Sequence, residues 1–261
     1  MARHAECGAG APLVRPVISL AGHGLVVVGG GSGLGWAAAE CALTLGARVV
    51  VADLDAQSAD RVSSLGSGAS FLACDACSPE ETSSMFAEAA RRLGHIDGVL
   101  TTVGGAHLGE LESLDLSAWR AELDFNLTSA YVVCRAALPH LRERRGAIVT
   151  TSSGYAVLAG PDRMGYSAAK AGVIAFTRSF AARAAADGVR ANCIAPGPID
   201  TPRFRAMNGG DAGVERVRER MPLGRIPRPI DVANTAIFLL SDAAAHITGQ
   251  VIHVNGGLLM P

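Results

Sequence analysis

The sequence lacks long hydrophobic runs. Stretches such as 25–28 and 236–240 contain four and five apolar residues, whereas a helix that crosses a bilayer needs about 20. Residues 1–20 also lack the continuous apolar core of a signal peptide. We expect these residues to form an N-terminal tail that is either disordered or packed on a neighbouring subunit. We therefore expect a cytoplasmic protein with no membrane partner.

The charges form no one-sided patch. The chain has 23 lysines and arginines against 24 acidic residues, mixed along its length, and a formal net charge of −1. Proteins that bind nucleic acid usually carry a basic stripe. The sequence therefore indicates no nucleic-acid partner.

The six cysteines show no disulfide framework. Cys74 and Cys77 form a single C-x-x-C pair, which would suit redox or metal chemistry. We favour the alternative that Cys74, at the end of an apolar stretch, is a small core residue. No second ligand stands at a suitable spacing from His107, so we expect no bound metal. The pattern suits a reducing cytoplasm.

The chain does contain a regular alternation of short apolar stretches and helical segments. Of its 261 residues, 49% are hydrophobic and 18% are charged, which suits one α/β domain with a sizeable core. Short apolar stretches between helices are typical of parallel strands covered on both faces. We expect strands at 25–28, 48–52, 70–74, 99–103, 147–151, 191–195 and 251–254, and helices at 34–45, 79–93, 116–144, 166–187 and 229–240.

Right-handed crossovers between such strands predict a Rossmann-like, doubly wound parallel sheet of about seven strands, in a single domain over residues 21–261. The least regular segment is 201–221, where Gly209, Gly210 and Gly213 stand among charged residues. We predict that it forms a mobile flap beside a site, with a plain surface loop as the alternative.

A glycine-rich turn follows the first predicted strand and leads into a helix. Glycines allow positive φ and close backbone approach, and the free N–H groups at a helix start attract a pyrophosphate. A tight turn alone would look similar, but the strand–turn–helix order, with an acid ending the second strand, favours a dinucleotide. The candidate residues in the turn are Gly29, Gly31, Ser32, Gly33, Leu34 and Gly35.

Asp53 is that acid, 18 residues after Gly35. Its carboxylate can accept hydrogen bonds from both hydroxyls of an adenosine ribose. A 2′-phosphate would meet like charge there, and the next residue, Leu54, offers no cation, so we predict NAD rather than NADP. Asp53 could alternatively cap a helix at 55–65. Asp75, which ends the third strand, could bind the adenine amino group or cap a turn before Pro79.

Several later motifs complete a pattern. Tyr166 and Lys170 stand four residues apart, Ser153 lies thirteen residues before Tyr166, and Asn126 precedes both. In this order, with the glycine turn and the two acids, the chain resembles the short-chain dehydrogenase/reductase family from about residue 20 to its C-terminus. The remaining motifs in the family's order are Pro196-Gly197 and Asn255-Gly256-Gly257.

The resemblance implies further contacts with the cofactor. The turn after Pro196 and Gly197 would meet the nicotinamide amide through the Ile199 backbone and the Thr201 hydroxyl. The other cofactor positions that it implies are Ala76, Val103, Gly104, Tyr166 and Lys170. The family is commonly dimeric or tetrameric, so we expect a homodimer or homotetramer with the helices at 116–144 and 166–187 in its main interface.

The sequence departs from the family's pattern at two places. Val28 stands where the family usually has Thr, and Thr101-Thr102-Val103-Gly104 replaces Asn-Asn-Ala-Gly. In the family the threonine supports the Asn-Ala-Gly segment, so the two losses are interpreted as coupled. We expect them to affect local sheet stability and cofactor affinity but not the reacting groups. Asn255, where the family often has Asp, is a milder change.

The spacing of Tyr166 and Lys170 suits proton transfer. A tyrosine has a pKa of about 10, and moving it by ~3 units takes ~4 kcal/mol. An ammonium about 4 Å away, at an effective dielectric near 20, supplies roughly that much. Residues i and i+4 share a helix face, so we expect Lys170 to lower the pKa of Tyr166. The alternative is an ordinary helix tyrosine beside a solvated lysine.

Ser153 and Asn126 would complete the proton relay. The Ser153 hydroxyl, at the end of the fifth strand, can hold the substrate oxygen. By the resemblance, Asn126 holds a water that links Lys170 to solvent. Candidate substrate contacts are His107, Tyr155, Leu158 and Met164, with Phe204 and Met207 from the flap, although each could equally be simple packing.

These features predict an NAD-dependent enzyme that interconverts a secondary alcohol and a ketone by hydride transfer. Two alternatives stay open. One is an NADPH-dependent ketoreductase for 3-oxoacyl thioesters or polyketides, and the other is a protein that senses NAD, or acts as a scaffold, without turnover. The expected partner is a small-molecule alcohol or ketone.

Overall fold

The computed structural model describes residues 18–261. Most of the predicted N-terminal tail lies outside these residues. Leu20, at the end of that segment, is fully buried, and its backbone N–H donates to the Leu45 carbonyl at 3.0 Å. Leu20 therefore packs with the domain.

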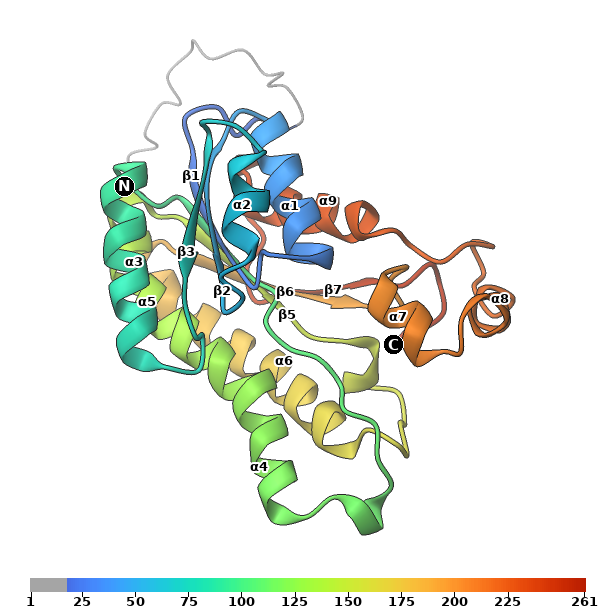
Figure 1. The fold of residues 1–261 in the computed structure, drawn as a ribbon. Coiled ribbons are helices and arrows are strands. Elements are labelled where there is room, and N and C mark those ends of the chain that lie inside the picture. The colour runs from blue at the N-terminus through green and yellow to red at the C-terminus, as the bar shows by residue number, and fades with distance from the viewer. Residues whose placement is uncertain (1–17) are drawn as a thin grey trace, which may run out of the picture.

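The strands form one seven-stranded parallel sheet in the order β3-β2-β1-β4-β5-β6-β7 (Figure 1). This confirms the predicted doubly wound fold. The strands are β1 (Gly24–Val28), β2 (Arg48–Asp53), β3 (Ala69–Ala73), β4 (Gly98–Thr101), β5 (Ala147–Thr151), β6 (Arg190–Pro196) and β7 (Val251–Val254).

Helices cover both faces of the sheet (Figure 1). α1 packs on α9 over one face, and α3 packs on α5 over the other, with α6 beside α5. The helices are α1 (Gly33–Thr44), α2 (Ser58–Ser63), α3 (Pro79–Leu93), α4 (Leu116–Leu123), α5 (Ser129–Arg144), α6 (Met164–Ala184), α7 (Pro202–Met207), α8 (Asp211–Arg218) and α9 (Pro229–Leu240). No helix among residues 18–261 is both long enough and apolar enough to span a bilayer.

The central strands supply the core on both faces. All five residues of β1 are buried. Leu25 and Val27 join the core beneath α1 and α9, while Val26 and Val28 join the core beneath α3 and α5. Successive strand residues point to opposite faces, so an unbroken valine-rich run serves both layers at once.

The helix predicted at 116–144 is interrupted. A π-helical turn at Asp124–Thr128 separates α4 from α5. Within this turn the Asn126 side-chain amide donates to the Glu122 carbonyl at 3.1 Å and so occupies an acceptor of the preceding helix. π-turns of this kind often occur at functional sites, and this one turns Asn126 toward the carboxyl ends of the strands.

The segment predicted as a flap or loop, 201–221, is largely helical. Pro202 occupies the first turn of α7, and the Thr201 hydroxyl accepts a hydrogen bond from the Phe204 N–H at 3.1 Å. Gly209 and Gly210, both with φ of +75°, separate α7 from α8. The plain-loop alternative is therefore wrong, and the mobility of this segment stays a prediction.

Candidate active site

The larger of the two cavities beside the predicted catalytic residues lies at the carboxyl ends of β1 to β4. Its volume is about 860 Å³. β1 pairs with β2 on one side and with β4 on the other, so the cavity sits where strand order reverses, which is the usual ligand position in such folds. Twelve of the predicted cofactor residues line this nucleotide cleft: Gly29, Ser32, Gly33, Leu34, Gly35, Asp53, Leu54, Asp75, Ala76, Val103, Gly104 and Thr201.

Six other predicted cofactor residues do not line the cleft: Tyr166 and Lys170 on α6, and Gly31, Pro196, Gly197 and Ile199. Gly31 lies behind the Asp53 carboxylate, and Ile199 packs against the core beneath α1 and α9. Gly197 donates its N–H to the Val254 carbonyl at 3.1 Å, while Pro196 ends β6. The chain after β6 is therefore held by the last strand, and it reaches the cleft at Thr201, Pro202 and Arg203.

The glycine turn needs its glycines. Gly29 has a φ of +79°, a conformation that favours glycine. A Cβ on Gly35 would stand 2.4 Å from the Gly29 carbonyl oxygen. The first turn of α1 therefore presses directly on the end of β1, which leaves its N–H groups facing the cleft as an anion site.

Asp53 is tied to this turn. Its carboxylate accepts hydrogen bonds from the Gly31 N–H at 2.8 Å and from the Asp55 N–H at 3.1 Å. A carboxylate has about four acceptor positions, so it keeps capacity for ribose hydroxyls. The alternative role as a helix cap is wrong, because α2 begins only at Ser58.

A cation missed by the sequence reasoning also lies near the turn. Arg61, from α2, donates to the Gly31 carbonyl at 3.2 Å, and its guanidinium lies 3.9 Å from the centre of the Trp36 ring. Asp75 lines the cleft, and its carboxylate also accepts from the Cys77 N–H at 2.8 Å. The two roles considered for Asp75, capping a turn and binding the adenine amino group, therefore do not exclude each other.

Both cysteines of the C-x-x-C pair line the cleft. Burial raises the pKa of Cys74, and burial, followed by the charge of Asp75, raises that of Cys77 to about 11. A thiol with a raised pKa is a poor nucleophile, which agrees with an unreactive structural role.

The departures at positions 28 and 102 lie together. The Thr102 hydroxyl donates to the Gly29 carbonyl at 2.8 Å and reaches the Val28 carbonyl at 3.3 Å. This hydroxyl therefore joins the end of β4 to the end of β1. The Thr151 hydroxyl adds a 2.8 Å bond to the Thr101 carbonyl, which joins β5 to β4.

Lys170 lies buried beneath the ends of β4 and β5. Its ammonium donates to the Thr151 carbonyl at 2.9 Å and to the Val103 carbonyl at 3.4 Å. Burial lowers the pKa of Lys170 to about 8, while Cys193 and Glu122 act in the opposite direction. The interpretation of Lys170 as a solvated charge is wrong.

Tyr166 is half-buried on the same helix, with the Lys170 nitrogen 5.8 Å from its ring centre. Burial is the largest influence and raises the pKa of Tyr166, while hydrogen bonding with Ser153 and the charges of Arg163 and Arg203 lower it. Lys170 is not among the groups that lower the pKa of Tyr166, so the expected lowering of this pKa by Lys170 is wrong. The ammonium lies beside the ring, and the cations that lower the pKa come from other segments.

Asn126 and Lys170 meet beside Gly104. A Cβ on Gly104 would stand 2.6 Å from both the Asn126 Oδ1 and the Lys170 Nζ, and this glycine has a φ of +141°. The Asn126 Oδ1 also accepts from the Gly105 N–H at 2.9 Å. The structure therefore brings Asn126, Ser153, Tyr166 and Lys170 together, as predicted.

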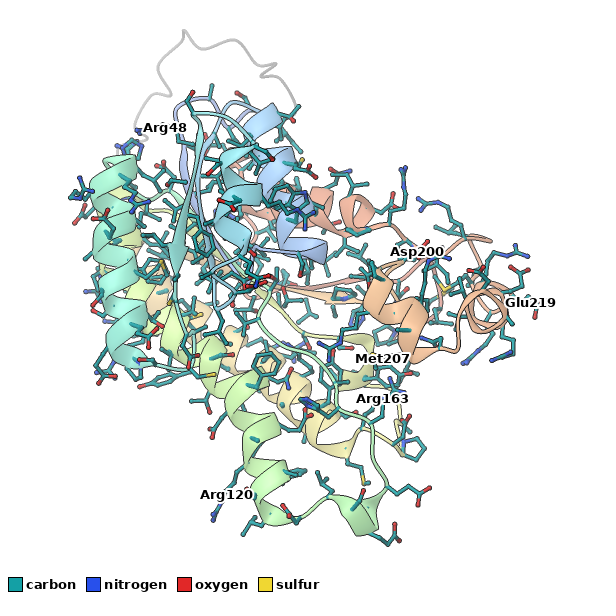
Figure 2. All side chains as sticks on the ribbon, in the orientation of Figure 1. Arg48, Arg120, Arg163, Asp200, Met207 and Glu219 are labelled. Carbon is teal, nitrogen blue, oxygen red and sulfur yellow. The ribbon has the colours of Figure 1, made fainter. Side chains whose placement is uncertain are left out.

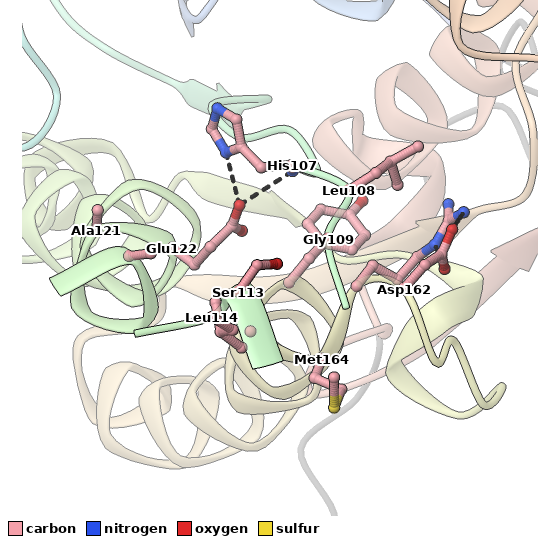
Figure 3. Close-up of a pocket in the computed structure, with 13 residues that line it drawn as sticks. His107, Leu108, Gly109, Ser113, Leu114, Ala121, Glu122, Asp162 and Met164 are labelled. Atoms are coloured by element: carbon pink, nitrogen blue, oxygen red, sulfur yellow. Dashed lines mark hydrogen bonds and ion pairs between the residues drawn. The ribbon is translucent and has the colours of Figure 1, made fainter. Parts of the chain in front are cut away.

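A second cavity, of about 310 Å³, lies beside Tyr166 (Figure 3). His107 and Met164 line it, as predicted. Tyr155 and Leu158 do not, because the Arg163 guanidinium covers the Tyr155 ring at 4.3 Å and Leu158 is partly exposed. The lining is a mixture of Leu108, Leu114 and Met164 with the polar side chains of Ser113, Glu122, Asp162 and Arg163.

The predicted flap residues Phe204 and Met207 do not line this substrate-side cavity either. Figure 2 shows Met207 on α7 and Arg163 before α6 at the same end of the molecule. Instead Arg203 reaches inward from α7, lines the nucleotide cleft and donates to the Ala106 carbonyl at 3.0 Å.

Sequence reasoning also missed Glu122. Its side chain is only 6% exposed, and its carboxylate accepts from the His107 ring nitrogen Nδ1 at 2.6 Å (Figure 3). An acid four residues before Asn126, on the same helical face, is a signal that could have identified it.

Comparison with known proteins gives consistent matches. A sequence family described as Enoyl-(Acyl carrier protein) reductase matches residues 28–259. Over 243 residues the chain is 32% identical to the 2,5-dichloro-2,5-cyclohexadiene-1,4-diol dehydrogenase of Sphingobium indicum, covering 91% of this chain and 97% of the relative. It is 36% identical over 238 residues to the cis-4-hydroxycyclohexanecarboxylate dehydrogenase of Sinomonas cyclohexanicum, covering 89% and 94%.

A solved structure matches the whole fold. This is the short-chain dehydrogenase/reductase SDR:Glucose/ribitol dehydrogenase of Brucella melitensis. It superposes with a TM-score of 0.88 at 30% identity, covering 94% of this chain and 99% of that one.

Proposed function

We propose, from the premise that this chain belongs to the short-chain dehydrogenase/reductase family and is an oxidoreductase, that it interconverts a secondary alcohol and a ketone with NAD. The observation that carries the proposal is the position of Tyr166. It lines the substrate-side cavity, is half-buried, and shares a helix with Lys170, while Ser153 is among the groups that lower its pKa.

The nucleotide cleft fits a dinucleotide. The Gly35 and Gly29 positions exclude side chains, and the first N–H groups of α1 face the cleft. The turn would hold the pyrophosphate, and Asp53 would accept hydrogen bonds from the adenosine ribose. When bound there, the nicotinamide would accept a hydride from the substrate carbon during alcohol oxidation.

The chain's own residues would manage the proton. Ser153 would hold the substrate oxygen through its hydroxyl, and the Tyr166 phenolate would take the hydroxyl proton as general base. In the reverse direction the Tyr166 hydroxyl would return a proton to the carbonyl oxygen. Lys170, fixed by the Thr151 and Val103 carbonyls, would hold positive charge next to this exchange. We propose that Asn126 extends the relay from Lys170 toward solvent.

The names of the two sequence relatives suggest where to look for the substrate. Both name a hydroxyl carried on a six-membered carbon ring. The substrate-side cavity combines leucine and methionine with polar side chains, which suits a compact ring with a hydroxyl. We propose cyclic secondary alcohols as the first substrate class to test.

NAD preference is proposed from Asp53. A 2′-phosphate would lie against its carboxylate, although Arg61 near Gly31 offers partial compensation. Titration with both nucleotides tests this directly. Asp53→Asn should lower the NAD over NADP affinity ratio about 10-fold, since a repulsion of about 1.4 kcal/mol between the carboxylate and a 2′-phosphate is removed. An unchanged ratio would remove Asp53 as the determinant.

A second candidate keeps some support. The chain is 32% identical over 239 residues to the 3-oxoacyl-(acyl-carrier-protein) reductase of Chlamydia muridarum, which is consistent with a ketoreductase for 3-oxoacyl thioesters that prefers NADPH. Turnover of a 3-oxoacyl thioester with NADPH, faster than that of cyclic alcohols with NAD, would select this function.

We further propose a homodimer or homotetramer. Tyr131 on α5 is 46% exposed and packs edge-on against Phe176 of α6, with ring centres 6.2 Å apart. Exposed aromatic surface on these two helices supports an interface there. Light scattering coupled to size-exclusion chromatography measures the assembly.

A further inference from the structure

A buried carboxylate lies next to the proposed catalytic residues. Glu122, in the last turn of α4, is 5% exposed. A Cβ on Gly165 of α6 would stand only 3.1 Å from the Glu122 Cβ, so the two helices approach closely just before Tyr166. Removing a carboxylate from water is costly unless its oxygens are hydrogen-bonded.

Three donors satisfy this carboxylate. Oε1 accepts from the His107 backbone N–H at 3.0 Å and from the His107 Nδ1 at 2.6 Å. Oε2 accepts from the Asn126 Nδ2 at 3.0 Å. Glu122 thus joins a buried amide of the proposed relay to an imidazole whose side chain is 78% exposed (Figure 3).

These contacts determine which way the Asn126 amide faces. Nδ2 has three acceptors around it: the Glu122 carboxylate, the Glu122 carbonyl at 3.1 Å and the Gly105 carbonyl at 3.2 Å. The amide oxygen is therefore turned the other way, to the Gly105 N–H and to the point beside Gly104 that it shares with the Lys170 ammonium. A flipped amide would set its NH₂ group against that ammonium.

We propose that Glu122, held by His107, is a positioning residue of the reaction: it fixes the Asn126 oxygen toward Lys170 and places a buried negative charge next to the relay. The proposal rests on the function proposed above. It assigns to Glu122 no contact with the reacting atoms.

The charges around the site agree with this role. Burial lowers the pKa of Lys170, and Glu122 from α4, with Cys193 from β6, raises it. The same Glu122 charge raises the pKa of Tyr166, while Arg163 before α6 and Arg203 from α7 lower it. Loss of the carboxylate charge should therefore move both groups toward losing their protons at lower pH.

The chain allows an unusually direct test, because Lys170 is its only lysine. In protein labelled with ¹³Cε-lysine, the single side-chain signal reports the ionisation of Lys170 without any turnover. The titration is recorded for wild type, Glu122→Gln, Glu122→Asp and a control, Glu112→Gln. Glu112 is an exposed acid in the segment that connects β4 to α4.

We expect Glu122→Gln to lower the Lys170 titration midpoint by about half a pH unit or more, since a charge a few ångströms away commonly has such an effect. In alcohol oxidation the rising limb of the kcat/KM profile should shift to lower pH as well. Glu122→Asp keeps the charge but shortens the side chain. It should leave the midpoint near that of wild type while kcat falls about 10-fold through the misplaced amide.

A midpoint in Glu122→Gln equal to that of wild type, or an equal shift in Glu112→Gln, would overturn the proposal. A purely structural role would lower Tm without moving either profile. If Glu122→Gln does not fold, Glu122→Asp decides, and unchanged kcat there overturns the proposal. A shifted midpoint in a protein that turns over no alcohol would sustain the role of Glu122 and refute the proposed reaction instead.

Discussion

The two cavities that flank the segment after β4 are built in different ways. The nucleotide cleft is made by the glycine turn and by strand ends, so backbone N–H groups and small residues shape it. The substrate-side cavity is made by side chains from three separate segments, around His107, Glu122 and Met164. A cleft built from backbone depends on local sequence, whereas a cavity built from side chains depends on how distant segments pack.

The substitution that should distinguish the two cavities most strongly is at a glycine of the nucleotide cleft. Gly35→Ala would place a methyl group 2.4 Å from the Gly29 carbonyl oxygen. Because backbone must shift, we expect nucleotide affinity to fall about 10- to 100-fold, equivalent to overpacking by about 1–3 kcal/mol. Calorimetric titration with NAD measures it.

Gly109→Ala is the matched control on the other cavity. Its Cβ would meet only the Ser113 hydroxyl, at 3.1 Å, at the end of a flexible side chain. We expect nucleotide affinity to stay within about 2-fold of wild type, well below the 1.4 kcal/mol of a tenfold change. Equal losses in both variants would contradict the separation of the two cavities.

The next effect concerns the buried ammonium between the cavities. Burial lowers the pKa of Lys170 to about 8 from an ordinary 10.5, so its charge costs stability below that pH. Lys170→Met should therefore raise the free energy of unfolding at pH 7 by on the order of 1–3 kcal/mol, less the lost hydrogen bonds, while abolishing turnover.

The sign of the pH dependence follows from proton counting. Between about pH 8 and 10.5 the unfolded chain binds the lysine proton and the native chain does not, so the stability of wild type rises with pH. The advantage of Lys170→Met should shrink across this range. Denaturant melts at several pH values check it, and a constant difference would contradict the lowered pKa.

The smallest effect tests the link between β1 and β4. Thr102→Val removes the 2.8 Å bond to the Gly29 carbonyl and should cost about 1 kcal/mol of unfolding free energy. Thr101→Val, whose hydroxyl takes no part in this link, is the control. Adding Val28→Thr to Thr102→Val should restore part of the loss, and a failure to do so would show that the two positions are independent.

The features that could be predicted from the sequence are those that depend on a short local pattern of residues. The positions of the strands, the glycine turn, the position of Asp53 and the helical spacing of Tyr166 and Lys170 all follow from residues close together in the chain. Each depends on backbone geometry or on a fixed period, both of which are visible in a short stretch of sequence.

What the sequence could not show depends on distant contacts. The break before Asn126 arises because its amide competes for a helix carbonyl. The Thr102 hydroxyl bonds to carbonyls at the end of a strand more than seventy residues away. The burial that raises the pKa of Tyr166 comes from packing, so a simple estimate from the Lys170 charge gave the wrong direction.

The most direct test of the account is Tyr166→Phe, measured for both NAD binding and oxidation of cyclic secondary alcohols. Removing one hydroxyl leaves the nucleotide cleft intact. We predict NAD affinity close to that of wild type and a turnover lower by about 10²- to 10⁴-fold. Turnover at the wild-type rate in this variant would contradict the assignment of Tyr166 as the group that exchanges the proton.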